Sequence, residues 1–173
     1  LDIFKNNQKW HKLPEDVFIS MCKMFTMISD YKDTIEMIYN KQPKVIVAAS
    51  GMMTGGRILS YLERYVDKPE TTIIIIGYQG EGTRGRKILD SASEIKIYGK
   101  YLSVKATVLE IEGLSAHGDQ NDLLNWMSVL ENKPKKVFLV HGENQPADEL
   151  RIKNKEKYGF ECTIPLMGQE FEI

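Results

Sequence analysis

The sequence contains few of the residues from which metal centres and disulfide frameworks are built. It has 2 cysteines and 3 histidines among 173 residues. Cys22 and Cys162 show no paired spacing, which argues against a disulfide framework and against a cysteine zinc site. Such thiols are typical of a reducing compartment, so we predict a cytoplasmic location and buried, inert cysteines.

Long hydrophobic runs are also missing. The run over residues 73–76 consists only of isoleucine and is followed by Gly77, and no run approaches the roughly 18 apolar residues of a membrane span. A short β-branched run of this kind indicates a buried strand. We therefore predict no membrane partner and no signal peptide. The chain begins with Leu1 rather than methionine, which we expect of a fragment or a processed product.

Neither sign of charge is in excess. The 23 Lys and Arg residues are balanced by 24 Asp and Glu residues, which gives a net charge of -1. Overall charge therefore provides no attraction to nucleic acid, and any contact with RNA or DNA must come from local basic clusters. The hydrophobic content of 42% is ordinary for a globular protein.

Apolar, β-branched segments alternate with helical segments in the first half of the chain. Strands are predicted over residues 24–28, 44–49 and 71–78, and helices over 31–39, 54–65 and a short segment ending near 92. Ser29 or Asp30 can cap the first of these helices. Nearly continuous apolar strands that alternate with helices favour an α/β fold with a parallel sheet covered on both faces.

The pattern changes after residue 92. Alternating polar and apolar residues over 94–98 and 102–112, around Gly99 and Lys100, predict an antiparallel pair. Further elements are a helix over 120–130, a buried strand over 136–140, a helix over 147–158 and strands over 162–165 and 170–173. We find no internal repeat and no low-complexity linker.

The predicted strand over 44–49 leads into the glycine-rich segment S-G-M-M-T-G-G-R, residues 50–57. Strand ends beside helix N-termini attract anions through free amides, so Ser50, Thr54 and Arg57 are candidate phosphate contacts. The alternative is a tight turn with a capping residue and a solvated arginine, and the local features do not decide between the two.

The strand over 71–78 leads into a second glycine-rich segment, G-E-G-T-R-G, residues 80–85, which fits the dinucleotide-binding pattern G-x-G-x-x-G. That pattern requires an acidic residue about 20 positions later to hold the ribose, but the sequence there reads Tyr98-Gly99-Lys100. Arg84 and Arg86 suit bare phosphates better than a nicotinamide ribose. A Walker A loop is excluded, because no G-K-[S/T] occurs.

Two histidines stand where ligand or catalytic groups are common. His117 lies in a capping loop before a predicted helix, and His141 follows the apolar strand over 136–140. A catalytic zinc ion needs about three protein ligands, and the chain has no H-x-H or H-E-x-x-H motif. If the site binds metal, its remaining ligands must therefore lie elsewhere.

Four motifs in order then point to one family. S-G-M-M-T-G-G-R, G-Y-Q-G-E-G-T-R-G-R, L-S-A-H-G-D and V-H-G-E begin at residues 50, 77, 114 and 140. Together they resemble the C-terminal half of the β-CASP metallo-β-lactamase nucleases, which include the polyadenylation cleavage-factor endonuclease and the ribonuclease J enzymes. The resemblance covers residues 44–173 well and the first forty residues only loosely.

The resemblance implies roles for individual residues. His117 falls on the family histidine that contacts the scissile phosphate, and His141 falls on a histidine that ligates one of two zinc ions. The glycine-rich segments fall on loops that line the nucleic-acid cleft. The implied phosphate or nucleic-acid contacts are Ser50, Gly51, Gly55, Gly56, Arg57, Thr83, Arg86 and Ser115.

The resemblance also implies an organisation and a function. Residues 1–112 would be the C-terminal part of a β-CASP domain, a parallel sheet with flanking helices. Residues 113–173 would be the returning C-terminal segment of an αββα metallo-β-lactamase domain, including its RNA-metabolising motif. The full-length protein would be a zinc-dependent ribonuclease acting on single-stranded RNA, or on DNA, with a homodimer left open. The missing N-terminal half would supply the other zinc ligands, so we expect this chain alone to be inactive.

Two other functions remain open. The G-x-G-x-x-G match allows a dinucleotide-binding oxidoreductase domain, which would bind NAD rather than RNA. A non-catalytic nucleic-acid-binding homologue is the other alternative, since some members of the family have lost their metal ligands.

Overall fold

The computed structural model describes residue 3 and residues 6–172. The protein has a mixed α/β fold that divides into two compact units, Leu1–Ile46 and Val47–Ile173. The described strands form three two-stranded sheets. None of the helices in the described ranges is both long enough and apolar enough to cross a membrane.

The first unit consists of the 3-10 helix η1 (Gln8–Trp10) and the helices α2 (Glu15–Lys23) and α3 (Tyr31–Tyr39). The predicted helix over 31–39 is confirmed, and so is its cap, since the Asp30 carboxylate accepts a hydrogen bond of 2.8 Å from the amide of Asp33. The strand predicted over residues 24–28 is wrong. Its apolar residues are largely exposed, Met24 by 80%, so this connector gains nothing from pairing in a sheet.

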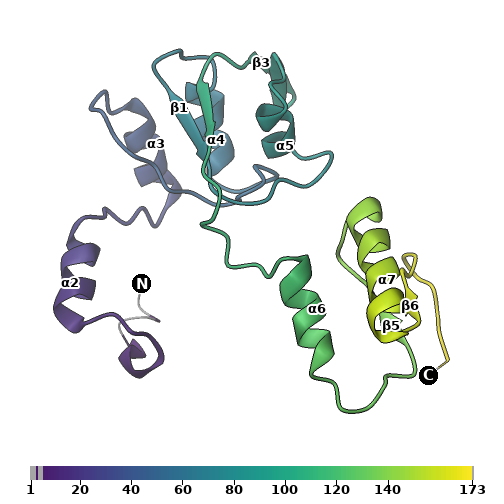
Figure 1. Ribbon diagram of the computed structural model, residues 1–173. Coiled ribbons are helices and arrows are strands. Elements are labelled where there is room, and N and C mark those ends of the chain that lie inside the picture. The colour runs from purple at the N-terminus through teal and green to yellow at the C-terminus, as the bar shows by residue number, and fades with distance from the viewer. Residues whose placement is uncertain (1–2, 4–5, 173) are drawn as a thin grey trace. The chain divides into compact units, whose positions relative to one another are not determined.

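The core of the second unit lies between two helices and two sheets. It is built by α4 (Ile58–Tyr65), β1 (Thr72–Ile75), α5 (Arg84–Leu89) and β2 (Glu94–Ile97). Figure 1 shows α4 beside the β1 strand, and α5 contacts β2. Its buried apolar residues are Met53, Leu59, Leu62, Val66, Ile73, Ile75, Ile88, Ile95, Ile97 and Ala106.

The antiparallel pair predicted around Gly99 and Lys100 is confirmed in part. β2 pairs antiparallel with β3 (Lys100–Ser103), but β4 (Thr107–Glu110) leaves this hairpin and pairs parallel with β1. The single strand predicted over 102–112 is therefore wrong. The amides of Lys105 and Ala106 both donate to the carbonyl of Val66, at 2.9 and 3.0 Å, and this contact redirects the chain between β3 and β4.

The strand predicted over residues 44–49 is also wrong in this structure, because no strand is assigned there. Val45 and Val47 are 92% and 82% exposed. Alternating β-branched residues favour an extended chain, but a strand needs a partner for its backbone groups. The following helix, predicted from residue 54, begins at Ile58, because the glycine-rich loop continues to Arg57.

The C-terminal elements are α6 (Gln120–Ser128), β5 (Val137–Phe138), α7 (Asn144–Tyr158) and β6 (Cys162–Thr163), with β5 and β6 parallel. Asp119 and Asp122 form a reciprocal capping box at the start of α6. The Tyr158 hydroxyl donates to the carbonyl of Leu124 at 2.8 Å and ties α7 to α6. The strand predicted over 170–173 is absent from residues 170–172, and Ile173 lies outside the described residues.

Candidate nucleic-acid interface

The first glycine-rich loop, residues 50–57, is held by its own hydroxyl groups. The Ser50 hydroxyl accepts a hydrogen bond from the Thr54 amide at 3.1 Å and lies 3.1 Å from the Thr54 hydroxyl. Glycine is required at Gly56, whose φ is +74° and whose added Cβ would lie 2.8 Å from the carbonyl oxygen of Ala49. At Gly51 and Gly55 an added Cβ would meet nothing within 4 Å, so the backbone there is open to a ligand.

The second glycine-rich loop, residues 80–85, ends in a helix cap. Thr83 precedes α5, and its hydroxyl accepts from the amide of Arg86 at 3.1 Å and donates to the carbonyl of Gly80 at 2.6 Å. The predicted phosphate contact Thr83 is therefore also a structural cap. Gly82 adopts a φ of +74°, which the tight turn before the cap requires.

The two loops are joined by a buried glutamine. The Gln79 side chain is 4% exposed, and its Nε2 atom donates to the carbonyls of Gly51 and Gly77 at 3.1 and 2.9 Å. Its Oε1 atom faces Gly85, where an added Cβ would lie 1.7 Å from that oxygen. The Gly85 amide donates to the Met52 carbonyl at 3.1 Å. Glycine at position 85 therefore permits the close approach of the two loops.

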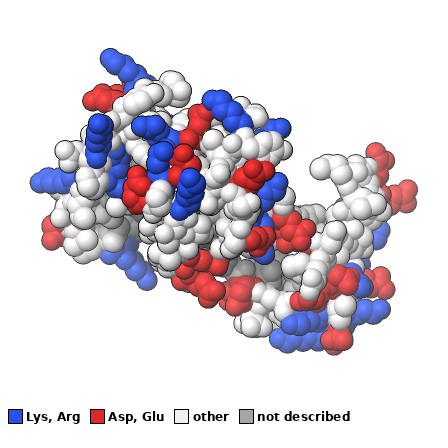
Figure 2. Space-filling view, turned by 90° about the horizontal axis from the view of Figure 1, so that it is seen from above, with Lys and Arg blue, Asp and Glu red and all other residues white. Residues whose placement is uncertain are grey.

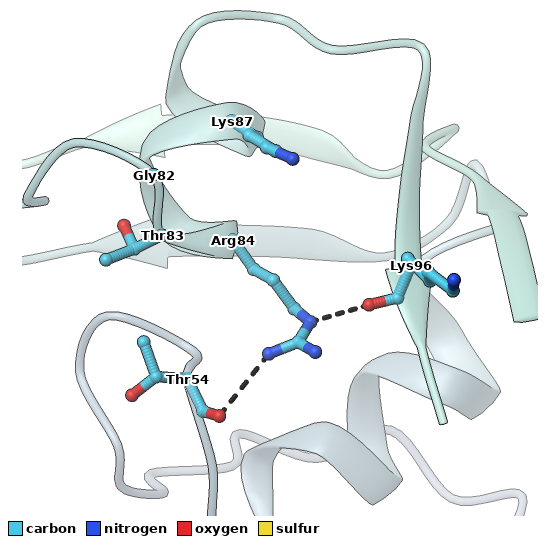
Figure 3. A pocket seen from close by; sticks show the side chains of 6 residues that line it. All are labelled: Thr54, Gly82, Thr83, Arg84, Lys87 and Lys96. Carbon is cyan, nitrogen blue, oxygen red and sulfur yellow. Dashed lines mark hydrogen bonds between the residues drawn. The ribbon is translucent and has the colours of Figure 1, made fainter. Parts of the chain in front are cut away.

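Arg84 forms a second connection between the loops (Figure 3). Its Nη1 atom donates to the carbonyls of Met53 and Thr54 at 3.2 and 3.3 Å, and its Nε atom donates to the carbonyl of Lys96 at 2.6 Å. A guanidinium group bound to three backbone carbonyls has a fixed position but keeps its positive charge. Arg84 thus organises the site and contributes to its electrostatic field.

A pocket of about 200 Å³ opens between the two loops. Figure 3 shows its lining, with Arg84 directed toward Thr54 and Lys96. The lining residues are Thr54, Gly82, Thr83, Arg84, Lys87 and Lys96. Three of these residues are basic and none is acidic. The Lys96 ammonium group is directed away from Arg84 and lies over the Tyr101 ring, so Arg84 and Lys87 supply the positive charge that favours an anion.

The sequence identified both loops but not all of the basic residues between them. Of the predicted contacts, Thr54 and Thr83 line the pocket. Lys87 could have been found, since it lies one helical turn after Arg84, whereas Lys96 reaches the pocket only because the β2–β3 hairpin returns beside α5.

The two predicted arginines lie on the exposed surface. Arg86 forms a two-pronged ion pair with Asp90, with its Nη2 and Nε atoms 2.8 and 2.9 Å from the carboxylate oxygens. This hydrogen-bonded carboxylate raises the pKa of Arg86 above its already high ordinary value. Arg57 is exposed at the start of α4. A phosphate contact by Arg86 would require the guanidinium group to leave or share its carboxylate.

His117, the predicted catalytic histidine, is hydrogen-bonded to Ser115, a predicted phosphate contact two residues earlier. The Ser115 hydroxyl lies 3.0 Å from Nδ1 of His117 and accepts a hydrogen bond from the His117 amide at 3.2 Å. His117 is exposed. Ser115 also lines a second pocket, of about 180 Å³, together with Tyr78, the residues that follow β1 and the end of β4. The structure thus places the His117 loop at the carboxyl ends of two parallel strands, where ligands commonly bind.

The predicted metal ligand His141 is exposed, follows β5 and adopts a φ of +66°. This left-handed conformation is uncommon for a residue other than glycine. Two residues later, a carboxylate oxygen of Glu143 accepts a hydrogen bond of 2.7 Å from the amide of Glu81 in the second glycine-rich loop. The V-H-G-E motif is therefore in contact with the G-E-G-T-R-G segment, which sequence spacing did not reveal.

The described residues do not form a complete metal site. Within them, no three His, Cys, Asp or Glu side chains gather closely enough to hold a metal ion. His141 could supply one nitrogen ligand, which is fewer than the three that a catalytic zinc ion needs from the protein.

Two family domains match the sequence. The Beta-Casp domain matches residues 1–88, and the Zn-dependent metallo-hydrolase RNA specificity domain matches residues 101–165. The first match covers just over half of the 173 residues. The chain belongs to the β-CASP family of metallo-β-lactamase nucleases. Its sequence is that of the family's C-terminal region, as the four motifs indicated, while the domain boundary between residues 112 and 113 stays a prediction.

Relatives of this β-CASP chain include archaeal proteins with RNA-related names. It is 30% identical over 150 residues to the transcription termination factor FttA of Pyrococcus abyssi, covering 84% of the chain and 23% of that protein. It is 32% identical over 141 residues to FttA of Methanosarcina mazei, with coverages of 79% and 22%. An RNase J-like protein of Methanocaldococcus jannaschii is 40% identical over 107 residues, with coverages of 62% and 25%. The chain thus spans about a quarter of the length of these curated relatives.

Proposed function

We propose that this chain is the RNA-binding part of a zinc-dependent ribonuclease and holds RNA backbone phosphates between its two glycine-rich loops. The observation that carries the proposal is the pocket lined by Arg84, Lys87 and Lys96. The family's RNA specificity domain and the RNase J-like relative support RNA as the ligand.

Local charge is the physical basis of this binding. On the face that Figure 2 shows, Lys and Arg are interspersed with Asp and Glu, as the net charge of -1 suggests. A phosphate therefore gains little from the general surface but gains from a pocket whose lining residues include three basic and no acidic ones. The open backbone at Gly51 and Gly55 allows a close approach of the nucleic acid. Contacts of this kind bind the backbone of a strand and do not read its sequence.

The contact between Ser115 and His117 supports the role that we propose for His117. When Ser115 donates its hydroxyl proton to Nδ1, the imidazole keeps its own proton on Nε2. That Nε2–H group can then donate to a phosphate oxygen or to the leaving oxygen of the scissile bond. His141 would be one ligand of a zinc ion, whose other ligands we place in the N-terminal half of the longer protein.

The proposal is tested by titrating fluorescent single-stranded RNA with this chain at several salt concentrations. Replacing Lys87 and Lys96 together by alanine should weaken binding and reduce the slope of log affinity against log salt by about 1.4, because each phosphate contact on a single strand contributes about 0.7. Lys155→Ala with Lys157→Ala on α7 is the control matched in charge and should leave the slope unchanged.

Three outcomes would count against the proposal. Equal effects of the two double variants on RNA affinity and on the salt slope would show that the pocket is not the binding site. Saturable binding of NAD in place of RNA would favour the oxidoreductase alternative. Metal-dependent RNA cleavage by this chain alone would show that its active site is complete. In the full-length protein, His141→Ala should lower the zinc content, while His117→Ala should abolish cleavage and spare the zinc.

A further inference from the structure

One carboxylate connects two motifs that are 62 residues apart in the sequence. Glu143, in the V-H-G-E motif, accepts a hydrogen bond of 2.7 Å from the amide of Glu81 in the second glycine-rich loop. The same carboxylate lies near Tyr78, in the segment that follows β1, and its interaction with the hydroxyl raises the pKa of Tyr78. An added Cβ at Gly80 would lie 3.8 Å from Oε1 of Glu143, so the carboxylate lies against the loop itself.

The electrostatic state of both partners reflects this contact. The hydrogen bond with Glu143 raises the pKa of the Tyr78 hydroxyl, and burial adds to the effect. The hydrogen bonds from Tyr78 and from the Glu81 amide lower the pKa of Glu143.

The contact is not explained by the capping of α7. Glu143 is the N-cap residue of that helix, yet its side chain makes no capping hydrogen bond. An N-cap side chain ordinarily accepts a hydrogen bond from the first turn of its own helix. Here the side chain instead reaches a loop outside the helix.

The loop that Glu143 reaches is itself fixed. Gln79 and Arg84 bind it to the first glycine-rich loop through backbone carbonyls, and Gly85 packs closely against Gln79. Because the Glu143 side chain is hydrogen-bonded to this fixed loop, it restrains the backbone of its neighbours in the sequence. His141 lies only two residues before Glu143. His141 has a left-handed backbone, which is unfavourable for a non-glycine residue unless the surroundings hold it.

From this geometry we propose that Glu143 is a positioning residue: by accepting a hydrogen bond from the Glu81 amide, it fixes the His141 loop against the second glycine-rich loop. This goes beyond the proposed function, because it requires neither RNA nor metal. It holds the His141 loop at a fixed position relative to the two glycine-rich loops.

The test compares Glu143→Ala with Glu143→Gln in the 173-residue chain, with neither RNA nor metal added. Glutamine keeps an acceptor oxygen for the Glu81 amide, whereas alanine removes it. We expect the alanine variant to speed hydrogen exchange at the Glu81 amide by about tenfold. The NMR order parameter of the His141 amide should fall toward that of a flexible loop. The glutamine variant should restore both quantities.

Glu149→Ala is the control on the same helix, since Glu149 is exposed and bonds to Gln145 one turn earlier. It should change neither the Glu81 exchange rate nor the His141 order parameter. Unchanged exchange in Glu143→Ala would overturn the contact. Faster exchange with a rigid His141 would overturn the positioning role. Failure of RNA to bind in the separate titration would reject the proposed function and leave both of these results standing.

Discussion

The close approach of the two glycine-rich loops predicts that Gly85→Ala will destabilise the protein, although Gly85 lies in helix α5, where alanine is normally favoured. The added Cβ would lie 1.7 Å from Oε1 and 2.8 Å from Cδ of Gln79, and 3.2 Å from the Met52 carbonyl oxygen. Gln79 is buried, so it cannot move aside into solvent. The substitution must therefore displace the side chain that joins the loops.

The expected magnitude follows from three contributions. Overpacking a tight site costs about 1–3 kcal/mol. Displacing Gln79 breaks its hydrogen bonds to Gly51 and Gly77, at about 1 kcal/mol each. The helix preference of alanine returns about 1 kcal/mol. We expect the free energy of unfolding to fall by about 2–4 kcal/mol, the sum of these terms.

Urea denaturation measures this change directly. Gly77→Ala is the control, because an added Cβ there meets nothing within 4 Å and its φ is not in the left-handed region. It should leave stability within about 1 kcal/mol of the original. In a double-mutant cycle, Gln79→Ala should relieve the clash, so the combined variant should be less destabilised than the sum of the two. Additive effects, or a Gly85→Ala variant as stable as the control, would refute the reasoning.

Three further predictions concern single residues around the same site. Thr83→Ala should lower the free energy of unfolding by about 1 kcal/mol through the lost helix cap, and Thr83→Ser should recover it in urea denaturation. Gly56→Ala should destabilise by about 1–3 kcal/mol, because its φ of +74° is strained for alanine and the Ala49 carbonyl oxygen is 2.8 Å away. The interaction with Tyr78 lowers the pKa of Glu143 in the folded chain. The ionised Glu143 carboxylate therefore stabilises the folded chain above the unfolded-state pKa. This contribution is lost as the pH falls through the folded-state pKa. Urea denaturation at neutral and acidic pH should therefore find Glu143→Gln less stable than the original at neutral pH and equal to it in acid.

The sequence alone determined the features that depend on near neighbours. The helix Tyr31–Tyr39 and its Asp30 cap follow from side chains within one turn of each other. The β2–β3 hairpin follows from alternation around Gly99, and its pairing is confirmed. The order of four motifs was enough to indicate the β-CASP family, which the domain matches then established.

Tertiary structure decided what depends on distant partners. Residues 44–49 have the composition of a strand, yet a strand requires a paired neighbour, and none is assigned there. Polar and apolar residues alternate along residues 102–112, which predicts one continuous strand. The hydrogen bonds to the Val66 carbonyl instead redirect the chain, so that β4 pairs with β1 and does not continue the hairpin.

The candidate site shows the same division. The glycine loops and the two histidines were visible in the sequence, because each lies beside the end of a predicted element. Lys96 in the pocket and Glu143 on the second loop were not, because each meets its partners only after chain segments far apart in sequence are folded together. Local propensity fixes short helices and turns, whereas a binding site assembled from several segments depends on long-range packing, which a single sequence does not display.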